Sequence, residues 1–431
     1  ICNKITFTVN LFPYTMIVTQ DRKTVNQNRE EDYFMVKHTP PLGWNTWNTF
    51  GKDINEQLIF ETVDKIVESG LKDAGYEYVV IDDIWALKER DSKGRLVPDP
   101  QKFPNGMKHV ADYIHSNGLK FGMYSCAGYL TCAQYPASYG HEWTDAETFA
   151  EWEVDFLKYD YCFHPVTVRA DILYKRMGIA LANCGRDILF SACSWGADDT
   201  KIWIKETGAN IWRSTGDIFD SWQSLKSLAQ SQLSVLEYNG QGCFNDMDML
   251  IVGMNGKGNV GINGCSDDEY RLHFSLWALL GSPLMIGCDV RNMSDETKAI
   301  LMNKEIIKIN QDIGCRQPFF VNNEKLVKNE NRKTDEPFYK EYQLERPIIA
   351  KYLDNGDIAI GMFNFTDDEV GVFCCAVNFD LLGLSVESGK TLEVTDLWSG
   401  KTETVKNDTF IIDGCKAHSC RMFRAKVVDK K

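Results

Sequence analysis

The clearest chemical signal in the sequence is a group of carboxylates that follow short apolar runs. Six acidic residues occupy such positions: Asp82, Asp83, Asp160, Asp217, Asp246 and Asp248. Any one of them alone is more often a helix cap or a loop residue than a catalyst. Their recurrence after several separate runs, together with an arginine in the same kind of position, predicts a shared acidic pocket.

Two of these carboxylates have the surroundings that acid–base and nucleophilic chemistry need. Lys158 and Asp160 are two residues apart, so on a strand their side chains share one face. The ammonium group would keep the carboxyl ionised, as a nucleophile requires, although a structural ion pair is the alternative. Arg213 and Asp217 flank another strand end, where a carboxyl open to solvent could exchange a proton. Two carboxyls facing each other across a pocket can hydrolyse a glycosidic bond.

Aromatic residues favour a sugar as the substrate. Five of them lie at or beside the ends of expected strands: Trp44, Trp47, Tyr124, Trp195 and Trp212. The C–H face of a pyranose packs on a flat ring, while its hydroxyl groups need fixed hydrogen-bond partners. Each residue alone is more typical of a core, but tryptophans beside carboxylates together favour a carbohydrate.

Composition and motifs argue against other classes of function. The chain has 431 residues and a net charge of −14, which disfavours nucleic acid and anionic membrane surfaces as partners. No apolar run approaches the roughly 18 residues of a membrane span. The 14 cysteines form no CxxC pair, and HExxH, GxGxxG and phosphate-loop motifs are missing. No metal or organic cofactor is expected, because two carboxylates suffice for the chemistry.

The order of elements predicts an α/β fold, a (β/α)8 TIM barrel. From about residue 40, short β-branched or aromatic runs alternate with stretches of helical period. Eight strands are expected, at residues 42–47, 76–81, 119–124, 154–159, 187–192, 210–213, 248–252 and 283–287. The active site of such a barrel lies at the carboxyl ends of the strands, where the carboxylates fall.

The sequence also predicts two helices within the barrel and a change from helical to strand patterns after it. Asn55 can cap a helix that ends near Gly70, and residues 268–280 form a helix that is apolar nearly all round. After Asp312 helical period gives way to alternating strands, with a hairpin signal at residues 354–356. We therefore expect a barrel over residues 35–315 and an antiparallel β-sandwich domain over residues 316–431.

The first residues are expected to lie outside the fold. Residues 1–34 contain a polar stretch typical of a flexible leader, and the sequence shows no signal peptide. Met35 would be a natural start for the folded part. The sequence leaves the oligomeric state open, a homo-oligomer included.

Six segments together resemble one known family. They are TPPLGWNTW (39–47), DAGYEYVVIDDIW (73–85), FLKYDYC (156–162), WRSTGDIFDSW (212–222), FNDMDML (244–250) and INQD (309–312). They strongly resemble glycoside hydrolase family 27, the retaining α-galactosidases and α-N-acetylgalactosaminidases. The resemblance covers residues 39 to about 315 in order, and the β-rich tail fits the family's C-terminal domain.

The resemblance assigns roles to the pocket residues. It makes Asp160 the nucleophile that forms a covalent glycosyl-enzyme, and Asp217 the acid that protonates the leaving oxygen and then the base that activates water. It gives Asp82 and Asp83 the O4 and O6 hydroxyl groups, and it gives Trp47 the stacking face. The other matched positions are Lys158, Arg213, Tyr124, Cys132, Asp248 and Met249.

Two departures from the family pattern matter. A cystine of the secreted members cannot form, because Ile84 stands at one position and no cysteine lies near Phe50. Cys132 and Cys162 match another family pair, so one disulfide could remain. The loss favours a cytoplasmic enzyme, with secretion as the alternative.

The second departure concerns substrate choice. In the segment ACSWGA, Ser194 and Ala197 replace the glutamate and leucine that animal-type galactosidases place against the 2-hydroxyl. Small residues there resemble the α-N-acetylgalactosaminidases, although Gly196 could redraw the pocket. We expect a retaining exo-α-galactosidase acting on a small carbohydrate, with α-N-acetylgalactosaminidase as the alternative.

Two further functions are weighed against this expectation. A β-L-arabinopyranosidase is disfavoured, because the pair Asp82 and Asp83 provides for a hydroxymethyl group. A catalytically inactive carbohydrate-binding barrel is the hypothesis from a different class. Such a barrel has usually lost a catalytic carboxylate, whereas this sequence keeps both.

Overall fold

The computed structural model describes residues 5–11, 14–20, 39–321, 344–371 and 376–430. It divides into two compact units, Ile1–Lys37 and His38–Lys431. In the first unit, strands β1 (Ile5–Leu11) and β2 (Tyr14–Gln20) pair antiparallel. The expected flexible stretch of the leader lies almost wholly in residues 21–38, outside the described residues.

The second unit is built around one parallel sheet of eight strands. Their order is β10-β8-β7-β6-β5-β4-β3-β12. From β3 to β10, strands that follow one another in the sequence are therefore neighbours in the sheet, and β12 pairs with β3. The strands are β3 (Leu42–Asn45), β4 (Tyr78–Val80), β5 (Lys120–Cys126), β6 (Phe156–Asp160), β7 (Leu189–Cys193), β8 (Ile211–Arg213), β10 (Phe244–Asp246) and β12 (Leu284–Ile286). The predicted α/β architecture of eight parallel strands is confirmed.

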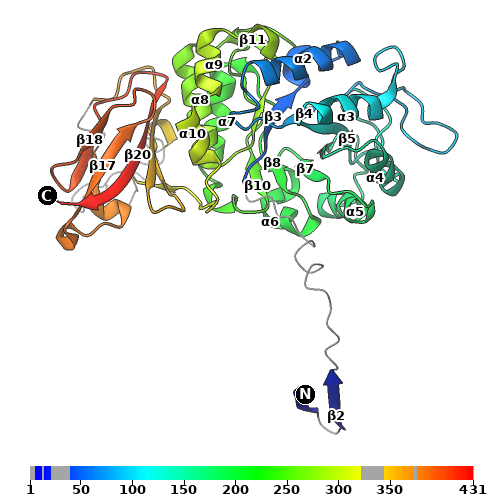
Figure 1. The fold of residues 1–431 in the computed structure, drawn as a ribbon, viewed down its shortest axis with the longest axis horizontal. Coiled ribbons are helices and arrows are strands. Elements are labelled where there is room, and N and C mark those ends of the chain that lie inside the picture. The colour runs from blue at the N-terminus through cyan, green and yellow to red at the C-terminus, as the bar shows by residue number, and fades with distance from the viewer. Residues whose placement is uncertain (1–4, 12–13, 21–38, 322–343, 372–375, 431) are drawn as a thin grey trace. The chain divides into compact units, whose positions relative to one another are not determined.

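Helices alternate with these strands and cover the sheet (Figure 1). They are α1 (Trp47–Phe50), α2 (Glu56–Glu68), α3 (Gly106–Ser116), α4 (Glu142–Glu151), α5 (Ala170–Asn183), α6 (Thr200–Trp203), α7 (Trp222–Gln232), α8 (Asp267–Leu280), α9 (Asp295–Leu301) and α10 (Lys304–Asn310). The predicted cap of α2 is confirmed, because the Asn55 side chain accepts a hydrogen bond of 2.8 Å from the Leu58 N–H. A short parallel pair, β9 (Asp220–Ser221) and β11 (Gly261–Gly264), lies apart from the main sheet.

One predicted strand is wrong in its position. The seventh barrel strand is β10 at Phe244–Asp246, and the expected strand at residues 248–252 does not form. The chain turns at Asp248, which has a φ of +82°. The apolar residues that follow are buried, but only Leu250 makes a strand-like bridge, a parallel one to Ile286. That bridge links the ends of the curled sheet.

The C-terminal part forms the expected antiparallel domain. Its six-stranded sheet has the order β13 (Phe319–Phe320), β14 (Ile348–Tyr352), β15 (Ile358–Asn364), β20 (Ser419–Asp429), β17 (Lys390–Asp396) and β18 (Thr402–Thr404). A second antiparallel pair joins β16 (Ala376–Asn378) and β19 (Thr409–Ile411). The predicted hairpin at residues 354–356 is confirmed, since it connects the antiparallel strands β14 and β15.

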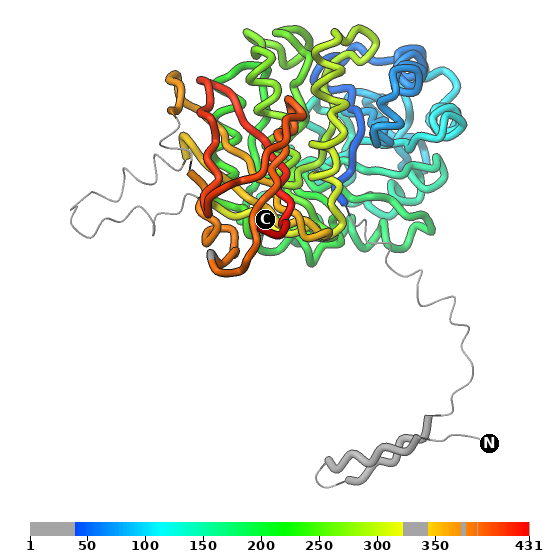
Figure 2. Tube along the Cα trace, turned by 60° about the vertical axis from the view of Figure 1, so that its left-hand side comes forward, coloured from blue at the N-terminus to red at the C-terminus, as the bar shows by residue number. Residues whose placement is uncertain are grey.

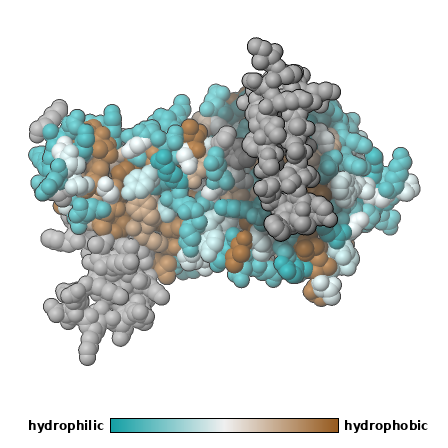
Figure 3. Space-filling model, turned by 90° about the horizontal axis from the view of Figure 1, so that it is seen from below, coloured by the Kyte–Doolittle hydropathy of each residue, from teal (hydrophilic) through white to brown (hydrophobic). Residues whose placement is uncertain are grey.

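The barrel and the β-domain share a hydrophobic core. Helix α8 packs against β15 and β20, and Figure 2 shows the late strands lying along the barrel helices. The larger core cluster contains Phe274 of α8 together with Phe363 and Met422 of the β-domain. On the face drawn in Figure 3, hydrophobic residues form separate patches among hydrophilic ones. No helix in the described part of the chain has the length and apolar character needed to cross a membrane.

Candidate active site

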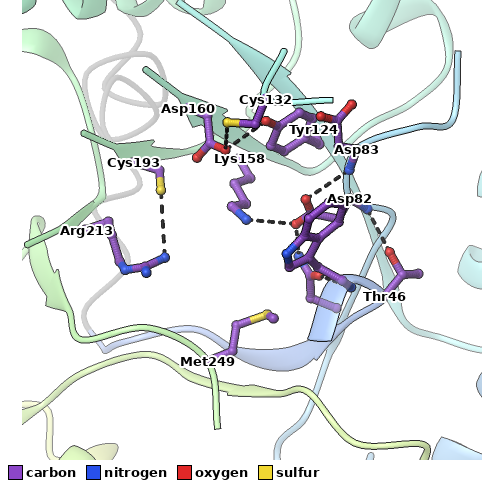
Figure 4. Close-up of polar contacts among 12 residues, drawn as sticks. Thr46, Asp82, Asp83, Tyr124, Cys132, Lys158, Asp160, Cys193, Arg213 and Met249 are labelled. Carbon is purple, nitrogen blue, oxygen red and sulfur yellow. Dashed lines mark hydrogen bonds and ion pairs between the residues drawn. The ribbon is translucent and has the colours of Figure 1, made fainter. Parts of the chain in front are cut away.

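A cavity of about 270 Å³ opens at the carboxyl ends of the barrel strands. Its wall contains most of the predicted site residues: Trp47, Asp82, Asp83, Tyr124, Cys132, Lys158, Asp160, Arg213, Asp217, Asp248 and Met249. They come from β3, β4, β5, β6, β8 and β10 or from the residues that follow these strands. Figure 4 shows how part of this set converges. The parallel barrel therefore brings together carboxylates that lie far apart in the sequence.

Asp160 ends β6 and is almost completely buried. The Tyr124 hydroxyl donates a hydrogen bond of 2.7 Å to Oδ2, and Cys132 Sγ lies 3.4 Å from the same oxygen. The other oxygen, Oδ1, has no nitrogen or oxygen donor among the described residues. Burial raises the pKa of Asp160, while the nearby Lys158 ammonium opposes that rise. The side chain is thus held in place through Oδ2 at the cavity wall, and its Oδ1 is buried.

The ammonium group expected beside Asp160 is bound by another carboxylate. Lys158 Nζ lies 2.9 Å from Asp82 Oδ2, which also accepts 2.7 Å from Asn45 Nδ2. The Asp82 N–H donates to Thr46 Oγ1 at 3.0 Å. These bonds cross-link the ends of β3, β4 and β6, so Lys158 acts on Asp160 through its charge.

Asp83 connects the end of β4 to the loop that follows β5. Its Oδ1 accepts from the Ile84 N–H at 2.7 Å and its Oδ2 from the Ala133 N–H at 3.0 Å. Burial nevertheless raises the pKa of Asp83 to about 6. The turn here is strained, because Ile84 is β-branched and has a φ of +70°. Such strain is typical of a chain segment that serves a site.

Arg213 holds the second pair of carboxylates. Its Nη2 atom donates to Asp217 Oδ1 at 3.0 Å and to Asp248 Oδ2. Asp248 Oδ2 also accepts 2.7 Å from the Ile218 N–H, and burial raises the pKa of Asp248 to about 6. Asp217, by contrast, is exposed, so its carboxyl can exchange protons with solvent. This difference suits a general acid and base.

Ser194 and Ala197 do not line the cavity, although the sequence placed them there. Ser194 is fully buried, with its hydroxyl against Thr200 Oγ1 at 2.5 Å. The physical reason is the backbone, because Trp195 has a φ of +55° and Gly196 one of +80°. A Cβ at Gly196 would lie 2.7 Å from the Ser214 carbonyl oxygen. Trp195 lines the cavity, whereas Ser194 is buried behind the wall.

Several lining residues escaped the sequence reasoning. Asn259 and Val260 come from the glycine-rich loop over the barrel top, and their N–H groups donate to Thr49 O and Asn48 O. Asn48, Ile218 and Phe219 complete the wall. The glycine-rich stretch at residues 254–264 had indicated a long loop over the barrel top, but nothing in the sequence showed which of its residues reach the cavity. Among the aromatic candidates, Trp44 and Trp212 belong to the core.

One disulfide lies at the cavity wall. Cys132 and Cys162 are bonded, with their Cα atoms 5.2 Å apart. The bond joins the loop after β5 to the residue two positions beyond Asp160. The pairing implied by the family resemblance is therefore present.

A parallel barrel whose strand ends hold a buried and an exposed carboxyl in one small cavity has the groups that glycoside hydrolysis requires. Residues 39–312 match the family model described as alpha galactosidase A, and residues 345–425 match its C-terminal beta sandwich domain. The chain belongs to the α-galactosidase family.

Relatives and solved structures agree with this assignment. Alpha-galactosidase 3 of Arabidopsis thaliana is 42% identical over 388 residues. The match covers 90% of this chain and 82% of the Arabidopsis protein. The crystal structure of α-galactosidase I from Mortierella vinacea has a TM-score of 0.78 at 34% identity, covering 91% of this chain and 98% of its own. An α-galactosidase from Saccharomyces cerevisiae, solved with raffinose, has a TM-score of 0.75 at 31% identity, covering 91% and 98%.

Proposed function

We propose that this protein is a retaining, exo-acting α-galactosidase that removes terminal α-linked galactose from small carbohydrates. The observation that carries the proposal is the pairing of buried Asp160 with exposed Asp217 on one cavity. A carboxylate held in place by hydrogen bonds and a carboxyl open to proton exchange are the two groups of double displacement. The identity of the sugar is inferred from the relatives, which are α-galactosidases.

The cavity supports cleavage at a chain end. Its volume of about 270 Å³ is near the lower limit of ligand pockets, about 300 Å³, which suits one sugar ring rather than a chain. Asp82, Asp83 and Lys158 form its polar wall and offer charged partners to the hydroxyl groups of a terminal sugar. Raffinose, bound by the Saccharomyces cerevisiae relative, carries such a terminal galactose.

The reaction follows from the positions of the two carboxyls. Asp160 would attack the anomeric carbon while Asp217 protonates the departing oxygen, which leaves galactose bound to Asp160. Asp217, now ionised, would then take a proton from water as the water displaces Asp160. Two inversions at one carbon return the original α-configuration. Lys158 and Arg213 keep positive charge near the cavity throughout.

The structure of the wall favours galactose over its 2-acetamido analogue. Ser194 and Ala197, whose small size had suggested room for an acetamido group, lie outside the wall. Trp195 lines the cavity in their place, and its backbone has a φ of +55°. We expect a bulky substituent on the sugar to clash with this large aromatic side chain.

The test is a rate comparison with p-nitrophenyl α-galactoside and its 2-acetamido counterpart. The parent enzyme should prefer the galactoside by about 100-fold in kcat/KM, the discrimination that steric differences in a pocket provide. Trp195→Ala should narrow that preference at least tenfold. Trp143→Ala, a change at an exposed tryptophan outside the cavity, should leave it unaltered. A parent enzyme that prefers the acetamido sugar would refute the proposed specificity.

A further inference from the structure

Two sulfur atoms and a carboxylate oxygen form a compact cluster at the proposed nucleophile. The ligand atoms of Cys132, Cys162 and Asp160 all lie within 4.8 Å of one another. Figure 4 shows Cys132 beside Asp160, with Sγ 3.4 Å from Oδ2. Thiolates, and not disulfide sulfurs, are the forms of cysteine that ligate metal ions. The disulfide therefore keeps the cluster from binding a cation through sulfur.

The spacing of these atoms suits tetrahedral zinc once the disulfide is open. Zinc–sulfur bonds of about 2.3 Å and zinc–oxygen bonds of about 2.0 Å at the tetrahedral angle separate sulfur from oxygen by roughly 3.5 Å. The observed separation between Cys132 Sγ and Asp160 Oδ2 is 3.4 Å. The two sulfurs would need to move to roughly 3.8 Å apart. Rotation about the Cα–Cβ bonds provides this movement, since the Cα atoms are 5.2 Å apart.

The backbone keeps the two cysteines close without the disulfide. The Tyr129 N–H donates 3.1 Å to the Phe163 carbonyl oxygen, and the Ala127 N–H donates 2.9 Å to the Asp160 carbonyl oxygen. Gly128 packs so tightly that an added Cβ would lie 1.9 Å from the Cys162 carbonyl oxygen. The loops after β5 and β6 are therefore held together by main-chain contacts. Opening the disulfide would leave its two thiols facing each other beside Asp160.

We propose that reduction of the Cys132–Cys162 disulfide creates an inhibitory zinc site from Cys132, Cys162 and Asp160. A phosphine reductant breaks the S–S bond and is oxidised to its oxide with the oxygen of water, while two S–H bonds form. Zn²⁺ then replaces the two thiol protons, which pass to solvent, and takes Asp160 as its third protein ligand. A fourth position stays open towards the cavity, which Cys132 and Asp160 line.

The consequence is a nucleophile whose availability depends on the disulfide. Asp160 bound to zinc cannot attack the sugar, whereas the intact disulfide leaves the carboxylate free in the presence of the metal. The inhibition rests on the proposed function, but the metal site does not. Both parts are therefore tested separately.

Metal binding is measured on the full chain with Co²⁺ as the probe, because thiolate ligands give cobalt an intense near-ultraviolet charge-transfer band. The protein is reduced with a phosphine and desalted before Co²⁺ is added. Reduced protein should bind one more equivalent than oxidised protein, and Zn²⁺ should displace it. Cys162→Ser treated identically should lack the extra equivalent, which separates this site from the other free cysteines of the described residues. Equal binding by oxidised and reduced protein would overturn the proposal.

Inhibition is measured on the reduced and on the oxidised enzyme. Each form is assayed without additions, with chelator, and with micromolar Zn²⁺. Zinc should lower the hydrolysis of p-nitrophenyl α-galactoside at least tenfold, and excess chelator should restore it. The oxidised enzyme should change less than twofold. Equal inhibition of both forms, or none of the reduced form, would contradict the switch. If neither form hydrolyses the galactoside, the proposed function fails while the cobalt result still decides the metal site.

Discussion

At the scale of single residues, the two carboxyls differ in their surroundings and so in the chemistry open to them. Asp160 is buried and accepts a hydrogen bond from the Tyr124 hydroxyl, whereas Asp217 is exposed and pairs with Arg213. A buried, oriented carboxylate loses little solvation when it forms a bond, and an exposed carboxyl exchanges protons readily. The proposed division into nucleophile and acid therefore rests on burial rather than on residue type.

Replacing the proposed nucleophile gives a specific product test. Asp160→Gly should lower kcat on an activated α-galactoside by at least about 1,000-fold, because no group remains to form the covalent intermediate. Added azide should enter the vacated space and yield β-galactosyl azide, the product of a single inversion. The parent enzyme with azide serves as the control. Near-normal turnover by the variant would show that Asp160 is not the nucleophile.

Asp83 makes stability depend on pH. Burial raises its pKa from 3.8 to about 6, so the folded protein holds this proton more tightly than the unfolded chain does. The contribution of Asp83 to the free energy of unfolding therefore falls as pH rises from about 4 to 6. Asp83→Asn removes the titration, so the variant should gain up to about 3 kcal/mol relative to the parent between pH 4 and pH 7. Urea unfolding at several pH values measures this, and a constant difference would contradict it.

At the scale of elements, α8 links the site to the rest of the barrel. The Trp277 indole donates 2.8 Å to the Asp248 carbonyl oxygen, and His273 Nε2 accepts from the Ile251 N–H. The helix begins with a capping box, in which the Ser266 hydroxyl accepts from the Glu269 N–H and the Glu269 carboxylate accepts from the Ser266 N–H. The helix thereby fixes the turn that presents Asp248.

The cap of α8 should have a measurable effect on stability. Ser266→Ala removes the acceptor for the Glu269 N–H and should lower the free energy of unfolding by about 1 kcal/mol. Ser266→Thr keeps a hydroxyl and should cost less than half as much. Urea unfolding of the three proteins measures both values. Equal stability of the alanine variant and the parent would show that the cap contributes nothing.

Irregular turns at the ends of two elements lie where the structure differs from the sequence-based predictions. The strand expected at residues 248–252 was inferred from its apolar run, but that run is buried irregular chain beyond a turn at Asp248. Ser194 and Ala197 were placed on the wall by the family resemblance, but the left-handed backbone at Trp195 and Gly196 turns the chain so that neither residue lines the cavity. Periodicity detects regular elements and does not detect such turns.

At the scale of the whole molecule, the order of elements was predictable because each barrel unit repeats one local pattern. The hairpin between β14 and β15 was also predictable, because its turn residues are a local signal in the sequence. The core shared by α8, β15 and β20 was not, because contacts between domains leave no local period in the sequence. The approach of the loop at Asn259 to the cavity is equally non-local.

The proposed function depends on double displacement in a cavity that holds one terminal sugar. The most direct test is proton NMR of the anomeric signal during early hydrolysis of p-nitrophenyl α-galactoside by the purified full chain. Two inversions at the same carbon predict that α-galactose appears first and β-galactose only later, through mutarotation. β-Galactose as the first product would contradict the role of Asp160, and no release of galactose would contradict the function itself.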